Sequence, residues 1–240
     1  MRAKLGNLSL GPRSPGRDGL NKHHPDYWDS GKRLVDHLIR HADLRPDSHI
    51  LDIGCGTGRL AHALRSYLDG GQYHGIDIRA DYVQACRKSF AFSKGYSFRH
   101  LDYYHPEWNT SGKKVPTELP YDPGSLDLVV VLGVLYHQDF TGAAEILHRS
   151  GHLIKHYGTL VCTAKLLNHH SMAHLSPDQY SSRSDKSWHA SRERPLLDVA
   201  HPEEGFRRAM LQSRLQIREP VRRGGWATGG QPDLVTAVKV

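Results

Sequence analysis

Apolar and polar positions alternate along this chain in two periods, and the two periods follow each other in a regular order. Short apolar runs have the length of buried strands, whereas longer stretches repeat apolar residues every three or four positions, which is typical of amphipathic helices. The predicted strands cover residues 49–53, 73–78, 96–100, 126–132 and 159–166, and the predicted helices between them cover residues 58–68, 80–93 and 142–154. Strands that alternate with helices indicate parallel βαβ units, in which ligands bind at the carboxyl ends of the strands.

Further elements are predicted on both sides of this repeating core. Ahead of it, apolar residues at helical spacing predict a helix that has Asp29 or Ser30 as its N-cap and ends before the next proline. After it, a helix over 202–213 opens with two glutamates, which suit the positive end of a helix dipole. Residues 215–221 and 234–240 then predict a closing antiparallel hairpin.

Three glycines at alternate positions follow the first predicted strand, in the sequence LDIGCGTG. A side chain at these positions would obstruct a sharp strand-to-helix turn and hold the backbone away from a ligand. Asp52, at the end of the strand, is expected to face the same crevice. A dinucleotide fingerprint would have a third glycine where Arg59 stands, and a Walker loop would end in Gly-Lys-Ser or Gly-Lys-Thr, so the spacing disfavours both phosphate-binding alternatives.

Two more acids stand at the ends of predicted strands. Asp77 closes the strand HGIDI, and Asp102 follows the strand that ends in FRHL. A carboxylate at the first position can accept hydrogen bonds from both hydroxyls of a ribose, although NAD sites use an acid at the same place. Together with LDLVVVLGVLYH at 126–137, these motifs in this order resemble the class I S-adenosylmethionine-dependent methyltransferases.

The resemblance extends from about residue 27 to residue 240 and implies an α/β, Rossmann-like fold. Its sheet would have seven mostly parallel strands in the order 3-2-1-4-5-7-6, with helices on both faces. The cofactor would be S-adenosyl-L-methionine and the product S-adenosyl-L-homocysteine, with Asp77 on the ribose and Asp102 on the adenine amine. The implied cofactor-binding residues are Tyr27, Trp28, Asp52, Gly54, Cys55, Gly56, Arg59, Asp77, Ile78, Asp102, Tyr103 and Leu132.

Two aromatic pairs have more than one interpretation. Tyr27 and Trp28 are candidates for a lid over the cofactor, and equally for packing of the first helix against the sheet. Tyr136 and His137 follow the central strand, where the family presents the transferred methyl group to the acceptor. The near-neutral pKa of an imidazole suits a general base, so His137 is the candidate catalytic residue; packing over the cofactor is the alternative.

The function implied by the resemblance is methyl transfer to an oxygen or nitrogen atom of a small-molecule acceptor, as in bacterial tailoring enzymes of secondary metabolism. Residues 167–201 fall where the family inserts a substrate-covering segment, and the turn His156-Tyr157-Gly158 replaces the family's usual Pro-Gly-Gly. An RNA or protein methyltransferase and a non-catalytic cofactor-binding module stay open as alternatives. No Asn/Asp-Pro-Pro-Tyr/Phe motif and no proline-preceded cysteine is present, which weighs against methylation of adenine or glutamine amides and of cytosine C5.

The distribution of charged residues along the chain bears on whether the acceptor is a small molecule or a nucleic acid. The chain has 240 residues, of which 38% are hydrophobic, and a formal charge of +7. Residues 1–22 and 183–223 each contribute +4, whereas residues 23–182, which carry the cofactor motifs, sum to −1. Because no basic stripe runs through the cofactor half, a small-molecule acceptor is favoured over nucleic acid. The sequence does not indicate an oligomeric state.

Cysteine and histidine usage bears on compartment and metal binding. Three cysteines give no disulfide framework, and neither a secretory signal nor an apolar run of membrane-spanning length is evident, so a cytoplasmic protein without a membrane partner is expected. Among 18 histidines, His148, His152 and His156 recur every four residues on one predicted helical face. No cysteine or carboxylate completes a tetrahedral set with them, so no metal site is expected.

Residues 1–22 are rich in Gly, Pro, Arg and Ser and show no apolar periodicity, which predicts a disordered basic arm ahead of a single domain over 23–240. Deleting this arm is expected to leave folding and cofactor affinity intact, because it has no apolar face with which to join a core. Thermal unfolding of the truncated protein measures this. A melting temperature several degrees below that of the full chain would show that the arm packs on the domain.

Overall fold

A computed structural model describes residues 25–113, 119–176, 179–182 and 186–240, so the arm at 1–22 lies outside the described residues. Its main sheet has the order β3-β2-β1-β4-β5-β11-β10. The first five strands are parallel, and β11 and β10 are antiparallel to their neighbours. When the seven strands of this sheet are numbered 1 to 7 in chain order, the order across the sheet is 3-2-1-4-5-7-6, as predicted. The strands are β1 (His49–Ile53), β2 (Gln72–Asp77), β3 (Tyr96–His100), β4 (Leu126–Val131), β5 (Ile154–Ala164), β10 (Leu215–Ile217) and β11 (Asp233–Lys239).

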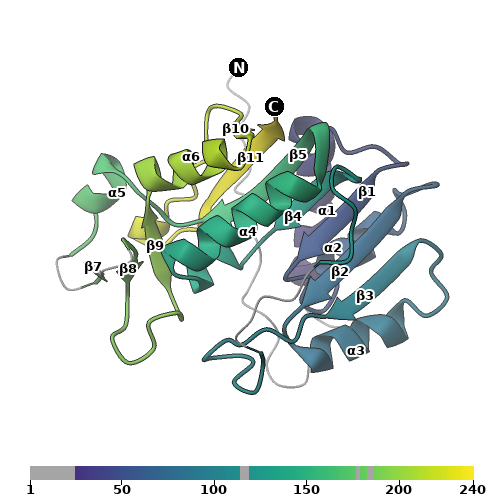
Figure 1. Cartoon of the computed structure of the whole chain (residues 1–240), viewed down its shortest axis with the longest axis horizontal. Coiled ribbons are helices and arrows are strands. Elements are labelled where there is room, and N and C mark those ends of the chain that lie inside the picture. Colours follow the sequence, from purple (N-terminus) through teal and green to yellow (C-terminus); the bar gives the residue numbers. More distant parts are fainter. Residues whose placement is uncertain (1–24, 114–118, 177–178, 183–185) are drawn as a thin grey trace.

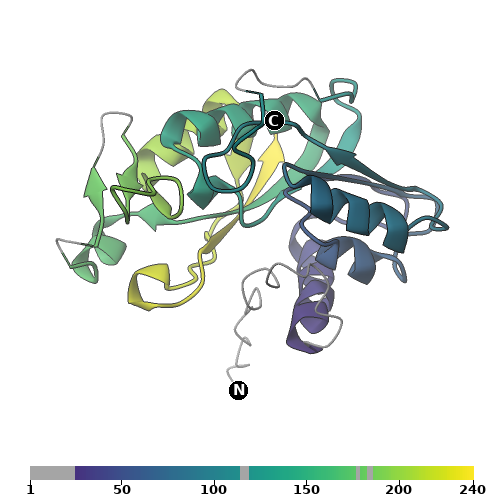
Figure 2. The same cartoon turned by 90° about the horizontal axis from the view of Figure 1, so that it is seen from below.

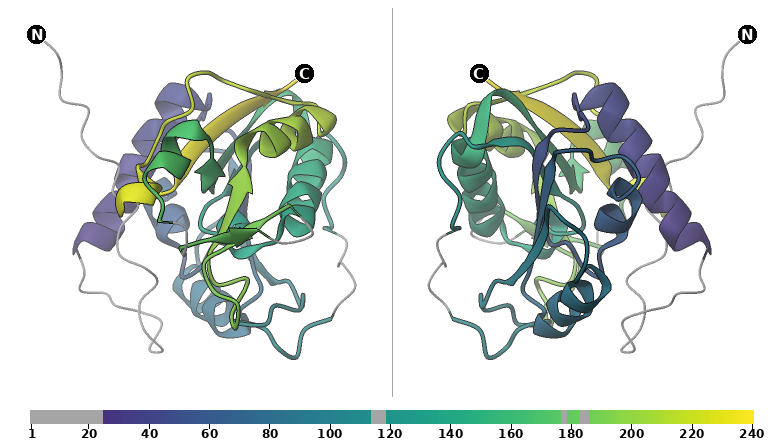
Figure 3. Two further views of the ribbon diagram at one scale, coloured as in Figure 1. Left: turned by 90° about the vertical axis from the view of Figure 1, so that its left-hand side faces the viewer. Right: turned by 90° about the vertical axis from the view of Figure 1, so that its right-hand side faces the viewer.

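Helices cover both faces of this sheet (Figures 1 and 3). One face packs against α1 (Pro25–His41), α2 (Arg59–Leu64) and α3 (Ala80–Ser89), and the other against α4 (Phe140–Leu153) and α6 (Glu203–Gln212). The view in Figure 2 shows α1 and α4 on opposite sides. Leu128 and Val130 of β4 belong to the first core, and Val129 and Val131 to the second. Because successive strand residues point to opposite faces, a strand covered on both sides is a continuous apolar run, which is why the sequence predicted it. No helix in the described part of the chain is long and apolar enough to span a membrane.

The first helix begins earlier than predicted. It starts at Pro25, so Asp29 and Ser30 lie inside it and the N-cap prediction was wrong. Proline is favoured at a first helical position because its φ is preset and its missing N–H would have no helical partner there. Instead of capping, the Ser30 hydroxyl donates to the Tyr27 carbonyl oxygen at 2.6 Å.

A second, smaller sheet of the order β6-β9-β8-β7 lies beside the main sheet, at the left in Figure 1. It is formed by the segment in which the sequence showed no pattern, and its strands are two to four residues long, too short for a period to be visible. Its elements are β6 (Leu166–Leu167), α5 (His169–Ala173), β7 (Ser181–Ser182), β8 (Trp188–His189) and β9 (Val199–Pro202), and two 3₁₀ turns, η1 (Leu135–His137) and η2 (Trp226–Thr228), flank it.

Strand β5 also begins earlier than predicted, at Ile154, and its pairing with β4 shifts register near Leu126. The turn His156-Tyr157-Gly158, which replaces Pro-Gly-Gly, lies in this irregular part of the strand, and Tyr157 has a left-handed φ of 64° there. His156 therefore lies in a strand, and the three histidines do not share a helical face as the sequence suggested. No group of three or more His, Cys, Asp or Glu side chains in the described residues could hold a metal ion.

Candidate active site

The glycine turn after β1 has the strained geometry that its sequence predicted. Gly54, Gly56 and Gly58 all have left-handed φ angles, of 80°, 55° and 84°. A Cβ atom at Gly54 would lie 2.3 Å from a methyl carbon of Val134, and one at Gly58 would lie 3.2 Å from the Cys86 sulfur. Gly54 and Gly58 are therefore closed to side chains by conformation and by neighbouring atoms, and Gly56 by conformation alone.

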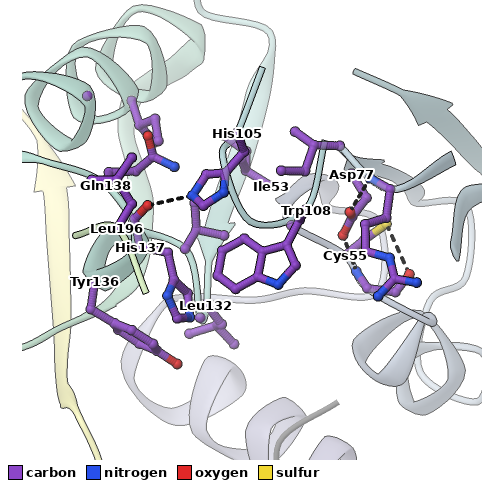
Figure 4. Close-up of a pocket in the computed structure, with 18 of the residues that line it drawn as sticks. Ile53, Cys55, Asp77, His105, Trp108, Leu132, Tyr136, His137, Gln138 and Leu196 are labelled. Carbon is purple, nitrogen blue, oxygen red and sulfur yellow. Dashed lines mark hydrogen bonds between the residues drawn. The ribbon is translucent and has the colours of Figure 1, made fainter. Parts of the chain in front are cut away.

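Asp77 fixes this turn from the end of β2. Its carboxylate accepts hydrogen bonds from the backbone N–H groups of Gly56 and Arg79, each at 2.8 Å. Burial raises the pKa of Asp77, and the two backbone bonds partly oppose that rise. A carboxylate has about four acceptor positions, so two are left for a ligand in the crevice beside the turn (Figure 4).

Asp52 is the more deeply buried acid, with 4% of its surface exposed. Burial raises its pKa to about 6, against the opposing hydrogen bond from Tyr73 and the charge of Arg59. The Tyr73 hydroxyl donates to this carboxylate at 2.5 Å. Asp52 thus changes charge in a pH range in which ordinary aspartates stay ionised.

A cleft of about 1650 Å³ runs along the carboxyl ends of the central strands. Its lining includes twelve of the residues singled out from the sequence: Tyr27, Asp52, Gly54, Cys55, Gly56, Arg59, Asp77, Ile78, Tyr103, Leu132, Tyr136 and His137. The structure thus brings the residues of four separate motifs to one cavity, as expected when parallel strands end at the same edge.

Two residues singled out from the sequence are not in this lining. Trp28 packs its ring on His62 of α2 at 4.5 Å, which fits the helix-packing interpretation, while its neighbour Tyr27 lines the cleft and hydrogen-bonds Thr57 at 2.7 Å. Asp102 accepts a long hydrogen bond of 3.5 Å from the Asn109 amide, and the residues on either side of it, Leu101 and Tyr103, line the cleft instead. Contact of Asp102 with an adenine stays a prediction.

Aromatic rings form the wall of the cleft beyond β4 (Figure 4). His105 stacks on Trp108 at 4.4 Å, and His137 meets Trp108 edge-on at 4.4 Å and Tyr136 at 4.6 Å. The His105 Nε2 atom donates to the His137 carbonyl oxygen at 2.9 Å, and its Nδ1 atom accepts from the Glu107 N–H at 3.1 Å. These two bonds hold His105 as a single neutral tautomer with both ring nitrogens engaged, so it supports the wall.

His137 is buried in this wall. Burial lowers its pKa to about 4, and interactions with the Leu197 backbone and the Asp198 carboxylate act in the opposite direction. Its Nδ1 atom is buried and makes no hydrogen bond to the residues that the structure describes. The imidazole is therefore neutral near pH 7 and can accept a proton, although a lowered pKa makes it a weaker base.

Sequence reasoning missed a charged cluster on the same cleft. Lys165 follows β5 directly and Asp198 precedes β9, and their side chains form an ion pair of 2.6 Å on the cleft wall. The position of Lys165 at the carboxyl end of a predicted strand was a usable signal. No sequence signal pointed to Asp198, because it lies in the segment 167–201, in which apolar and polar residues show no period.

Comparisons with known proteins agree with the fold. Residues 51–160 match a family described as a methyltransferase domain. A highly reducing polyketide synthase of Gibberella moniliformis is 29% identical over 125 residues, which are 50% of this chain and 4% of that protein. A ribosomal RNA small subunit methyltransferase A of Parasynechococcus marenigrum is 26% identical over 105 residues, 42% of this chain and 34% of that protein. The chain thus spans less than half the length of these curated relatives.

Solved structures share the fold over most of the chain. A geranyl diphosphate C-methyltransferase from Streptomyces coelicolor, solved with S-adenosyl-L-homocysteine, has a TM-score of 0.58 and 15% identity, covering 94% of this chain and 86% of its own. The [4+2]-cyclase SpnF has a TM-score of 0.60 and 16% identity, covering 88% and 82%. At such identities the likeness shows the fold alone. The chain thus has the fold of these solved structures, and its residues 51–160 match a methyltransferase domain.

Proposed function

We propose that this protein transfers the methyl group of S-adenosyl-L-methionine to an oxygen or nitrogen atom of a small-molecule acceptor. The observation that carries the proposal is the single cleft that joins the glycine turn and Asp77 to the aromatic wall around His137. Its first part has the backbone geometry and free carboxylate positions that a nucleoside requires. Its second part is apolar and aromatic, and suits a compact organic acceptor.

The protein's own contribution would be mainly positioning, because the sulfonium methyl group is already reactive. The cofactor would lie with its ribose on Asp77, and the acceptor against Tyr136 and His137. His137 would take the proton that a hydroxyl acceptor loses, in its neutral form. The loop that carries His105 and Trp108 and the segment at 190–198 would enclose the acceptor, since Glu107 and Arg194 form an ion pair between them.

The test of this function has two parts. Calorimetry with S-adenosyl-L-homocysteine, in buffer containing a metal chelator, should show binding, because the contacts that we propose for the cofactor, the glycine turn and the Asp77 carboxylate, involve no metal. Mass spectrometry should then detect a gain of one methyl group on some member of a panel of phenols, amines and carboxylic acids. Absence of cofactor binding would refute the function at its first step.

Cofactor affinity should depend on pH through Asp52. The folded protein without ligand holds Asp52 at a pKa of about 6, so the carboxyl is largely protonated at pH 5 and ionised at pH 7. A cationic cofactor favours the ionised form, so binding releases a proton and affinity rises with pH. We expect S-adenosyl-L-methionine to bind roughly tenfold more tightly at pH 7 than at pH 5.

The matched variant is Asp52→Asn, whose amide has no charge to change. Calorimetry from pH 5 to pH 7 should show little pH dependence in this variant. The same pH dependence in both proteins would assign the proton to another group, of which Asp77 is the first candidate because burial raises its pKa as well.

The similarity to a ribosomal RNA methyltransferase keeps an RNA acceptor as the second candidate. Its support in the chain is the net charge of +4 over residues 183–223. RNA held by such a surface would dissociate steeply with salt, because binding releases counterions. Tight, salt-sensitive binding of a ribosomal RNA fragment, with methyl transfer to it, would favour RNA over a small molecule.

A further inference from the structure

We propose that Lys165 and Asp198 form a polar subsite that selects a flat aromatic acceptor carrying an uncharged hydrogen-bond donor, such as a phenolic hydroxyl. The proposal rests on the proposed function, since it concerns the end of the cleft where the acceptor would bind.

The Lys165 ammonium has no donor left for a ligand. Its three N–H groups are matched by three contacts, at 2.6 Å to each oxygen of Asp198 and at 3.0 Å to the Tyr180 hydroxyl. The ammonium also lies over the Tyr180 and Trp226 rings, 5.7 Å and 5.6 Å from their centroids. Lys165 is thus enclosed, with 16% of its side chain exposed, and acts as the fixed counter-charge of Asp198.

Asp198 has acceptor positions to spare. A carboxylate offers about four, of which Lys165 uses two and Tyr180 one. The Asp198 side chain is 27% exposed, and it lines the cleft. The group that faces a ligand is therefore a hydrogen-bond acceptor, oriented by its partner, and it calls for a donor on the acceptor molecule.

An aromatic surface lines the same cleft as this pair. Trp108, His137 and Asp198 all belong to the cleft lining, and His137 contacts the Trp108 ring at 4.4 Å. One face of Trp108 is covered by His105, yet Trp108 keeps 36% of its surface exposed within the cleft. An exposed indole inside a cavity provides a stacking surface for a flat ring.

Charge narrows the class of ligand further. The ion pair is neutral as a whole, and its exposed member is negative. An anionic acceptor would meet a carboxylate and find no free ammonium, whereas a neutral hydroxyl or amino group would complete the hydrogen bonds of Asp198. The chemistry on the wall thus favours a phenol over a carboxylate or a phosphate.

The experiment uses three naphthalene probes of matched shape on the full chain saturated with S-adenosyl-L-homocysteine. By calorimetry, 2-naphthol should bind about tenfold or more tightly than 2-methoxynaphthalene, which lacks the donor, and than 2-naphthoate, which is an anion. Equal affinities for 2-naphthol and 2-methoxynaphthalene, or a clear preference for 2-naphthoate, would overturn the proposal. Because these comparisons use one unchanged protein, they do not depend on whether a variant folds.

Two variants assign the effect to the residues. Asp198→Ala, which removes both acceptor oxygens, should reduce the preference for 2-naphthol over 2-methoxynaphthalene to less than threefold, whereas Trp108→Leu should weaken both probes about three- to tenfold and leave the preference intact. Glu204→Gln, in an exposed ion pair on α6, is the matched control and should change nothing. An unchanged preference in Asp198→Ala would refute the assignment. Titration of S-adenosyl-L-homocysteine alone distinguishes the proposed function from the proposed subsite. If this product does not bind, the proposed function itself is refuted; if it binds and the probes show no preference, only the subsite is refuted.

Discussion

Replacing Asp77 by alanine is expected to weaken S-adenosyl-L-homocysteine binding by about 1–3 kcal/mol, or roughly 5- to 150-fold. The carboxylate would lose its bonds to the ribose, leaving polar hydroxyls unpaired in a buried crevice. It would also release the N–H groups of Gly56 and Arg79, which it now holds at 2.8 Å, so the glycine turn would lose its anchor. Calorimetry gives the affinity directly, and Asp77→Asn should fall between the two proteins because an amide oxygen can still accept one set of bonds.

The control for this variant is an acid of the same size that does not line the cleft. Asp36 lies exposed on α1, and Asp36→Ala should bind the product as the unchanged protein does. Thermal unfolding of both variants separates loss of the ligand contact from loss of the fold. Unchanged affinity in a folded Asp77→Ala protein would remove Asp77 from the site.

Replacing His137 by alanine is expected to slow single-turnover methyl transfer by about 10²–10⁴-fold if the acceptor must lose a proton to this imidazole. The pH profile is the sharper measurement. Because burial holds the pKa of His137 near 4, the base is neutral over the whole physiological range. The rate should therefore be flat above about pH 5 and fall only below it, in contrast to the break near 6.5 that an ordinary histidine gives.

His137→Gln keeps the shape and loses the base, so it should be as slow as the alanine variant. His148→Ala, which changes an exposed histidine on α4, is the control and should keep the native rate. If both His137 variants transfer methyl at near-native rates with the same pH profile, the acceptor needs no base from this residue. Proximity and orientation would then carry the reaction.

The cofactor half of the cleft could be predicted from the sequence because its determinants are local. A strand segment buried on both faces must be an apolar run, as residues 128–131 are, and a turn that excludes side chains must use glycine, as Gly54 and Gly58 show. The acids that end β1 and β2 then share one edge through topology alone. Each of these constraints involves a few residues that are neighbours in the chain, so it produces a pattern of residue types that can be recognised in the sequence.

The acceptor half depends on contacts between distant segments, which leave no such pattern. Lys165 and Asp198 are separated by 33 positions and meet only because a small sheet folds between them. The early start of α1 was missed for a related reason: a proline and two capping residues compete as helix starts, and the contact of Tyr27 with Thr57, 30 residues away, accompanies the longer helix. Short strands and long-range pairs are thus the part of this protein that only the structure reveals.

Strand β5 continues into β6 with Lys165 as the single residue between them, and the Leu166 N–H is bonded to Asp233 of β11 at 3.3 Å. The small sheet therefore starts as an extension of the main one, held at its first residue by a hydrogen bond to β11. Exchanging residues 167–201 for the corresponding segment of another protein of this fold would replace Asp198 and the rest of the cleft-lining segment at 190–198. The glycine turn and the aromatic residues around His137 would stay unchanged, because they come from other parts of the chain. The selectivity for the acceptor could thus be varied without altering the residues that we propose hold the methyl donor.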